Sequence, residues 1–387
     1  MSVTLPKGFV AAGGTAGLKA SGDPDLAVVA TEDAKPVAVA GVFTTNLVCA
    51  APVIVSRRHL AATGGSAVGV ILNAGNANAA TGQQGEADAE AMCAALAAQL
   101  GCDAEEILVC STGLIGIPLP VQQILNAVPG VAADLATTGA ADAAEAIRTT
   151  DSVRKEVAID GDGFTVAGMA KGAAMLQPNM ATMLAVLTTD ALAPHELLAE
   201  ALTTGVARSF NTLSVDGCTS TNDTVLLFAS GRSGRVDPDA LTDAVTAACL
   251  SLAEQMAADA EGATKVVRVI VTGARSDAEA DLAARAVANS ALCKCSWFGE
   301  DPYWGRIASE LGASGAMVDP SLLRISYGDT LVADGAVAVA HDASVVATHM
   351  AGSVIEITCA LGVGNGSATI LTNDLTHAYI DENMGTS

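Results

Sequence analysis

Apolar residues follow two patterns along this chain, and each pattern predicts a different kind of element. Short runs rich in β-branched residues, bounded by Gly, Pro, Asn or Asp, are typical of buried strands. These runs alternate with helical segments in no regular strand–helix–strand order. That mixture favours a layered α/β (α+β) sandwich over a barrel of eight βα units. The predicted strands are Val37–Phe43, Ala67–Leu72, Ile107–Cys110, Val153–Ile159, Thr165–Met169, Met183–Leu187, Thr224–Ala229, Lys265–Thr272, Leu322–Ser326 and Ser353–Cys359.

Other segments carry apolar residues at helical spacing. The segment Glu86–Leu100 has such a face, and Gly101 stands where a left-handed C-cap belongs. A longer helix begins with Asp237 as its N-cap and Pro238 in its first turn, and it ends near Gly262. One face of that helix carries Leu241, Val245, Cys249, Leu252 and Met256, and two further helices are predicted at His195–Arg208 and Ala278–Ala291.

The length of the chain bears on its division into domains. At 387 residues it exceeds one average domain and suggests about two. The turn Gly273–Asp277 is the best candidate for a boundary. The sequence therefore predicts a larger domain over residues 1–275 and a smaller one over residues 276–387.

The charge balance excludes several classes of partner. A net charge of −23 repels phosphate backbones and anionic lipid surfaces, so neither nucleic acid nor a membrane surface is expected as a partner. The uncharged stretch Gly172–Thr189 contains Gln177, Pro178 and Asn179, which are costly in lipid, so we reject a transmembrane helix. The first ten residues lack the pattern of a signal peptide, and the nine cysteines form no CxxC pair. A cytoplasmic protein without a metal site or cofactor is expected.

Polar residues follow two of the predicted strands in Gly-rich surroundings. Asn73, Asn76 and Asn78 lie in NAGNANAATG, and Thr112 and Gly113 lie in CSTGLIG. Asn amides at the end of a strand can line a site, and a hydroxyl beside a glycine N–H can hold a developing oxyanion. The alternative in both cases is an ordinary Asn/Gly or Ser/Thr turn.

Two further charged residues stand in unusual places. Lys171 is the only charged residue between Asp162 and Asp190, so we expect a substrate carboxylate or an internal Asp or Glu beside its ammonium group. Glu261 follows the long helix at its C-terminal end, where a carboxylate is disfavoured, so a compensating cation is expected. The alternative for Glu261 is a solvated acidic helix end.

Nine segments in this order resemble one protein family across residues 39–383: VAGVF, NAGNANAATG, CSTGLIG, TTDSVRKE, MAKGAAMLQPNMATML, CTSTNDT, ADAEGATK, FGEDPYWGR and NDLTHAYIDEN. The chain resembles the ornithine acetyltransferases, the glutamate N-acetyltransferases of the arginine pathway. Three places depart from the family's pattern. Ala80 stands where the pattern has Cys. Tyr303 stands where the pattern has Asn, and the tail after Asn383 ends at Ser387 without the usual aromatic residue.

The resemblance implies a self-cleaving enzyme of the N-terminal-nucleophile type. The chain would be cut between Ala181 and Thr182 into an α chain (1–181) and a β chain (182–387), two of each forming a heterotetramer. Thr182 would open a central strand of an α/β/β/α-type sandwich, with its hydroxyl as the nucleophile and its freed α-amine as the base. Thr112 and Gly113 match the oxyanion pair. The substrate-binding positions that match are Thr150, Lys171, Thr182, Glu261, Asn383 and Ser387.

The activity implied by the resemblance is transfer of acetyl from N2-acetyl-L-ornithine to L-glutamate through an acetyl-threonine. In that reaction Lys171 would face an α-carboxylate, and Glu261 would face the side-chain ammonium of ornithine. Some members of the family also accept acetyl-CoA as the donor. Two other functions remain open. An autoprocessing amidase or aminopeptidase would pass the acyl group to water, and a non-catalytic scaffold protein would keep the fold without being cleaved.

Overall fold

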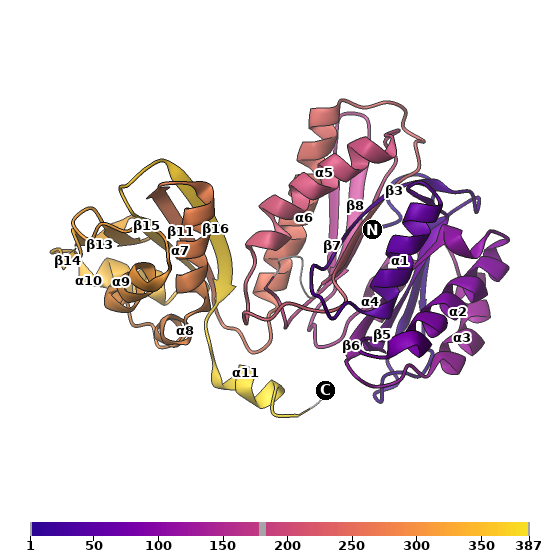
Figure 1. Cartoon of the computed structure of the whole chain (residues 1–387), viewed down its shortest axis with the longest axis horizontal. Coiled ribbons are helices and arrows are strands. Elements are labelled where there is room, and N and C mark those ends of the chain that lie inside the picture. The colour runs from indigo at the N-terminus through magenta and orange to yellow at the C-terminus, as the bar shows by residue number, and fades with distance from the viewer. Residues whose placement is uncertain (1, 178–182, 386–387) are drawn as a thin grey trace. The chain divides into compact units, whose positions relative to one another are not determined.

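A computed structural model describes residues 2–177 and 183–385, and the chain forms two compact units (Figure 1). The first unit contains residues up to 211 and residues 218–256, and the second contains residues 212–217 and 257–385. Each unit has its own sheets and its own apolar core. The longer segment of the second unit begins at Ala257. It therefore includes a strand that the sequence analysis placed before the boundary expected at residue 276.

The first unit is built on two sheets. One has the order β1 (Phe9–Gly14), β2 (Leu26–Thr31), β5 (Gly69–Asn76) and β6 (Ile107–Leu114). The other has the order β4 (Ser66–Ala67), β3 (Val37–Phe43), β10 (Thr224–Ala229), β9 (Leu184–Thr189), β8 (Thr165–Lys171) and β7 (Lys155–Asp160). The pairs β5–β6 and β9–β10 are parallel, and the other pairs are antiparallel. β9 therefore lies in the interior of its sheet.

Helices cover the outer faces of both sheets. α2 (Gly82–Leu100) and α3 (Val121–Ala133) share a core with the outward side chains of the first sheet. α5 (His195–Arg208) and α6 (Pro238–Ala258) lie along the second sheet, where Figure 1 shows them beside β7 and β8. Buried side chains between the sheets, such as Leu72 and Phe228, complete the layers. The predicted α/β/β/α sandwich is confirmed. The remaining helices of this unit are α1 (Ala51–Ala62) and α4 (Ala140–Ala146).

The second unit has one six-stranded sheet and its own helices. The strand order is β14 (Val337–Ala338), β13 (Thr330–Asp334), β12 (Arg324–Tyr327), β15 (Val354–Ala360), β11 (Val266–Ala274) and β16 (Gly366–Asn373). The helices are α7 (Asp277–Asn289), α8 (Ala291–Phe298), α9 (Trp304–Ala313), α10 (Ala343–Met350) and α11 (His377–Glu382). Buried aliphatic residues of β11 and β15 form a core with Trp297 of α8.

Several elements match their predicted limits, and others were missed. β3, β10 and α5 have the limits that the sequence predicts, and Gly101 caps α2 with a φ of +76°. β1 was missed because its sequence, FVAAGG, is almost free of β-branched residues. Its small residues allow α4 to lie close, since a Cβ added at Gly13 would meet the Asp142 carbonyl oxygen at 2.0 Å. Among the described residues, no helix has the length and hydropathy needed to cross a bilayer.

Candidate functional site

Thr112 and Gly113 lie within β6, opposite Ala74 and Gly75 of the parallel strand β5. The sequence analysis placed them in a turn after a strand ending at Cys110, which is wrong. The strand continues because its pairing with β5 extends beyond the apolar run. Gly113 has a φ of +128°, and an added Cβ would lie 2.3 Å from the Gly75 carbonyl carbon. Only glycine fits this position, because both its backbone conformation and its closeness to β5 exclude a side chain.

The asparagine side chains of the NAGNANAATG segment serve the fold. The Asn73 amide donates to the Asn76 carbonyl at 2.8 Å, and the Asn76 amide donates to the carbonyls of Ile117 and Pro118 at 3.2 Å. The Asn78 amide donates to the Gly85 carbonyl at 2.8 Å. These bonds satisfy buried backbone carbonyls. Of the two interpretations, the structural one therefore describes these three amides.

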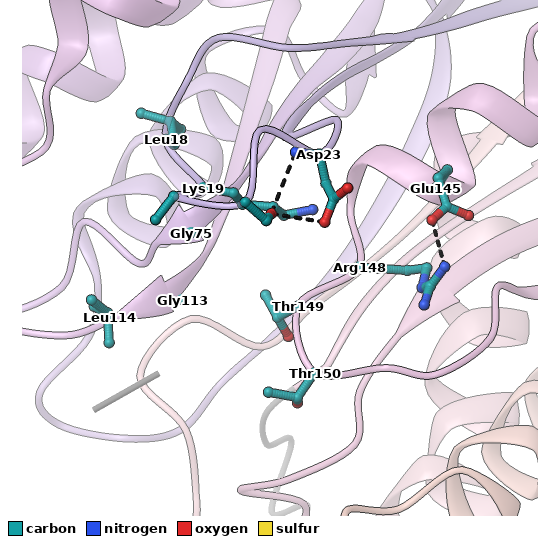
Figure 2. Close-up of a pocket in the computed structure, with 12 residues that line it drawn as sticks. Leu18, Lys19, Asp23, Gly75, Gly113, Leu114, Glu145, Arg148, Thr149 and Thr150 are labelled. Carbon is teal, nitrogen blue, oxygen red and sulfur yellow. Dashed lines mark hydrogen bonds and ion pairs between the residues drawn. The ribbon is translucent and has the colours of Figure 1, made fainter. Parts of the chain in front are cut away.

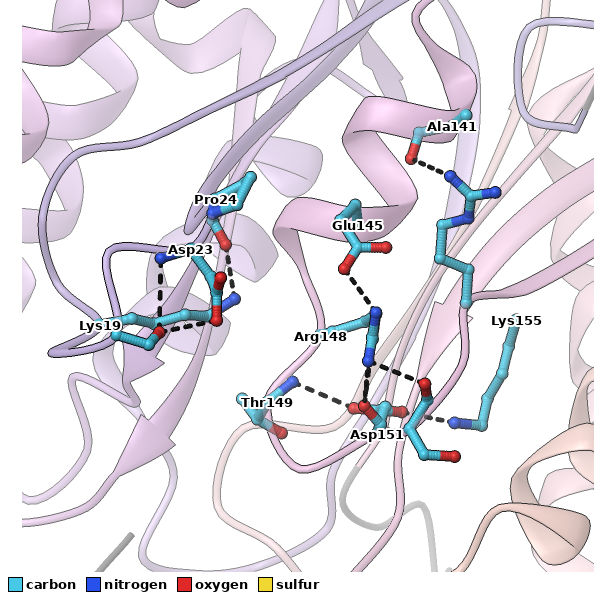
Figure 3. Close-up of polar contacts among 12 residues, drawn as sticks. Lys19, Asp23, Pro24, Ala141, Glu145, Arg148, Thr149, Asp151 and Lys155 are labelled. Atoms are coloured by element: carbon cyan, nitrogen blue, oxygen red, sulfur yellow. Dashed lines mark hydrogen bonds and ion pairs between the residues drawn. The ribbon is translucent and has the colours of Figure 1, made fainter.

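Lys171, at the end of β8, belongs to a buried charged cluster. Its Nζ lies 3.9 Å from a carboxylate oxygen of Asp151 and 3.4 Å from the Thr112 hydroxyl oxygen. The same carboxylate accepts from Lys155 Nζ at 2.6 Å (Figure 3). It also accepts from the Gly172 N–H at 2.7 Å. Of the two anions expected beside Lys171, the internal one is thus present. The cluster also fixes the Lys171 ammonium beside one member of the expected oxyanion pair.

The charges around Asp151 determine its protonation. Burial alone raises the pKa of this carboxyl, but Lys171, Lys155 and the Gly172 N–H outweigh burial and lower the pKa to about 2. Because the ordinary value is 3.8, the carboxylate stabilises the folded state above that pH. The contribution is lost as the pH falls from about 4 towards 2, and its size is about 2 kcal/mol.

Asp151→Asn tests this linkage. At pH 5 we expect the variant to be less stable than the native protein by about 3 kcal/mol or more, because two buried ammonium groups lose their anion. The difference in unfolding free energy should narrow by about 2 kcal/mol between pH 5 and pH 2.5. Urea unfolding at each pH measures it. A difference that stays constant over this range would contradict the lowered pKa.

Two adjacent residues that the sequence analysis missed connect the ends of β6 and β9. Asn222 donates through its side-chain amide to the Ser111 carbonyl at 2.9 Å and to the Ala77 carbonyl at 2.5 Å. The Asp223 carboxyl accepts the N–H of Met183 at 2.7 Å. The side chains of adjacent residues in an extended chain point to opposite sides, so Asn222 can bind β6 while Asp223 binds the residue before β9. The only signal in the sequence was the polar run CTSTNDT directly before a strand.

Asp223 is almost completely buried, with 1% of its surface exposed. Burial raises the pKa of its carboxyl well above the ordinary range, against the lowering effect of the Met183 N–H. Its second oxygen has no hydrogen-bond partner among the described residues. Towards Met183 the carboxyl group acts as a hydrogen-bond acceptor.

Two cavities in the first unit meet at Gly113. The smaller has a volume of about 30 Å³ and is lined by Thr112, Gly113, Met183 and Asn222 among others. The larger has a volume of about 790 Å³ and extends from Gly113 to the loop that carries Thr149 and Thr150 (Figure 2). The two cavities are thus lined by the expected oxyanion pair, by the expected substrate residue Thr150 and by Met183, which follows Thr182. Ala181 and Thr182 themselves lie outside the described residues.

Glu261 and Asn383 belong to the second unit. The Asn383 amide donates to a Glu261 carboxylate oxygen at 2.8 Å, so these two residues lie together. α6 ends at Ala258, and Glu261 follows in a turn that packs closely against α11. The partner that the structure gives Glu261 is thus a neutral amide, and a cation supplied by a ligand stays a prediction. Ser387 lies outside the described residues. In the described part of the chain, no cluster of three or more His, Cys, Asp or Glu is placed to hold a metal ion.

Comparison with known proteins establishes the family. The model of the ArgJ family matches residues 10–385. The chain belongs to the ArgJ family. An arginine biosynthesis bifunctional protein ArgJ from Mycobacterium leprae is 47% identical over all of this chain and 95% of its own. The ArgJ protein of Streptomyces coelicolor is 45% identical over the full length of both chains. The family that the nine segments predicted, and with it an arginine-biosynthesis enzyme, is confirmed.

A solved structure is also similar to part of the chain. It is an ornithine acetyltransferase from Mycobacterium tuberculosis, complexed with ornithine. It is 46% identical to this chain in a match that covers 47% of this chain and 95% of that one, with a TM-score of 0.44.

Proposed function

We propose that this ArgJ family member transfers acetyl from N2-acetyl-L-ornithine to L-glutamate through an acetyl group carried on Thr182. The observation that carries the proposal is the pair of cavities meeting at Gly113. Beside them lie Thr112, the buried ammonium of Lys171 and Met183, which directly follows Thr182 in the chain. A carbonyl at this junction would have a hydroxyl and a glycine N–H beside its oxygen.

The chemistry takes place in two balanced half-reactions. The Thr182 hydroxyl oxygen forms an ester bond to the acetyl carbon, the amide C–N bond of acetylornithine breaks, and the departing amine takes the hydroxyl proton. The amine of glutamate then attacks the ester carbonyl carbon, a new amide C–N bond forms, the ester C–O bond breaks, and a proton from the amine goes to the threonine oxygen. In each half-reaction the carbonyl oxygen becomes negative, and Thr112 and Gly113 stabilise it.

Self-cleavage supplies the base for this cycle. We propose that the chain is cut between Ala181 and Thr182, which frees an α-amine on the residue that carries the nucleophile. Such an amine has a pKa near neutrality and so can take the hydroxyl proton. The resulting α and β chains would remain associated as two copies of each, in the cytoplasm. Asn222 and Asp223 serve as positioning residues, since they hold the ends of β6 and β9 at a fixed spacing.

Acetyl-CoA is proposed as a second donor to the same threonine. The support is the name of the relatives, which are called bifunctional, together with their identity of 45–47% over the whole chain. No resident cofactor or metal takes part in the proposed cycle, because the threonine carries the acetyl group between donor and acceptor.

One experiment tests cleavage and transfer together. The intact mass of the purified, denatured protein should show two chains of residues 1–181 and 182–387 in place of one of 38.4 kDa. The same sample should form N-acetylglutamate from acetylornithine and glutamate, with parallel initial-rate lines when both substrates are varied. Release of acetate at the same rate with and without glutamate would favour the hydrolase. An uncleaved, inactive chain would favour the scaffold protein.

A further inference from the structure

The wall of the large cavity also carries charges of both signs. Lys19 and Asp23 come from the loop between β1 and β2, and Glu145 and Arg148 come from the end of α4 and the residues that follow it. Figure 2 shows the first pair across the cavity from the second. None of these four side chains is among the positions carried over from the family.

Arg148 and its neighbours are engaged within the fold. The Arg148 guanidinium pairs with Glu145 and donates to the main-chain carbonyls of Asp151 and Ser152 at 2.7 and 2.9 Å (Figure 3). These bonds shape the loop that presents Thr150 to the cavity. Asp23 accepts from the Ser21 hydroxyl at 2.7 Å. Arg148 therefore stabilises the loop that forms this wall of the cavity.

Lys19 is differently placed. Its ammonium donates to the Pro24 carbonyl at 2.5 Å, a neutral acceptor that leaves the positive charge uncompensated at that bond. Its main chain is fixed by the buried Asp25 carboxylate, which accepts the N–H groups of Leu18 and Lys19. Burial lowers the pKa of the ammonium, and the nearby Asp25 and Asp23 carboxylates offset this only in part. A half-buried cation in a preorganised loop gains free energy when an anion enters beside it.

The proposed ping-pong cycle places a specific demand on this cavity. The first product, ornithine, has a cationic side chain, whereas the acceptor that replaces it, glutamate, has an anionic one. Both share the α-amino and α-carboxylate groups, so a residue that separates the two must act on the end of the side chain. We propose that Lys19 binds the side-chain carboxylate of the acyl acceptor. This inference rests on the proposed function.

Lys19→Met tests the assignment, because methionine keeps the apolar stem and removes the charge. We expect KM for glutamate to rise roughly 10- to 100-fold, as for the loss of one charge-assisted hydrogen bond. Exchange of labelled ornithine with acetylornithine does not require glutamate and should change by less than about twofold. Lys19→Arg should recover most of the affinity for glutamate. Lys35→Met, which removes an exposed lysine of the same unit, is the matched control and should change neither rate.

Three outcomes would overturn the assignment. The first is an unchanged KM for glutamate in Lys19→Met. The second is a loss of ornithine exchange as large as the loss with glutamate, which would place Lys19 at the shared α-carboxylate. The third is an effect of Lys35→Met as large as that of Lys19→Met. Failure of the proposed function is recognised separately, as a native protein that transfers no acetyl. Calorimetry then tests Lys19 by itself. If Lys19→Met loses glutamate binding and retains ornithine binding, the subsite is supported. If Lys19→Met and the native protein bind glutamate equally, the subsite is refuted.

Discussion

Thr182→Ala is expected to leave the protein as one 387-residue chain with no measurable acetyl transfer. Alanine has no hydroxyl, so it can neither attack the preceding carbonyl during cleavage nor carry the acetyl group afterwards. Loss of a covalent nucleophile should lower kcat by at least about a thousandfold. Intact mass gives the state of cleavage, and N-acetylglutamate formation gives the activity.

Thr182→Ser is the matched control, because serine keeps the hydroxyl and loses only a methyl group. We expect it to be cleaved at the same bond, more slowly than the native chain, and to retain transfer. Thr182→Ala should keep the native unfolding temperature within a few degrees, because the substitution changes only one small side chain. A Thr182→Ala protein that is still cleaved and fully active would remove Thr182 from the mechanism.

Asp223→Ala is expected to slow self-cleavage by roughly 10- to 100-fold, corresponding to about 1–3 kcal/mol for a buried N–H left without its acceptor. The N–H belongs to Met183, so its release loosens the chain directly after Thr182. Asp223→Asn should cleave at close to the native rate, because the amide oxygen can accept the same Met183 N–H. The time course of the intact mass after synthesis measures both variants.

Asp190→Ala separates positioning from general loss of stability. Asp190 is also buried and also accepts a backbone N–H of the first unit, that of Thr165 at 2.8 Å. If both alanine variants lose similar unfolding free energy but only Asp223→Ala is cleaved slowly, Asp223 acts through the position of Met183. Equal slowing in both would reduce Asp223 to a structural role. A cleavage defect in Asp223→Asn as severe as in Asp223→Ala would instead show that the proton of the carboxyl is needed.

The sequence predicted the layered architecture and many of its elements because these depend on local patterns. The helical face of α6 buries the side chains that its periodicity requires, including Leu241, Val245 and Cys249. Asp237 caps α6 as predicted, since its carboxylate accepts the Ala240 N–H at 3.0 Å. The order of nine segments was also sufficient to identify the family. These inferences require only neighbours in the chain.

The detailed site required the tertiary structure, since its contacts join residues far apart in the chain. Lys171 meets Thr112 across 59 positions, and Asn222 meets Ser111 across 111. No periodicity records such pairs. The same limit explains why the asparagines of NAGNANAATG remained ambiguous, because the carbonyls that they satisfy become visible only once β5 and β6 are paired.

The sequence by itself therefore determined the family and the fold class and named the expected nucleophile, because motifs and apolar periodicity are properties of the linear chain. The tertiary structure decided which residues surround Gly113. It placed Gly113 inside a strand where no other residue fits, gave Lys171 an internal carboxylate, and put Lys19 in the wall of the cavity that Gly113 also lines. Burial and long-range pairing fix these relations, and they arise only when the strands assemble.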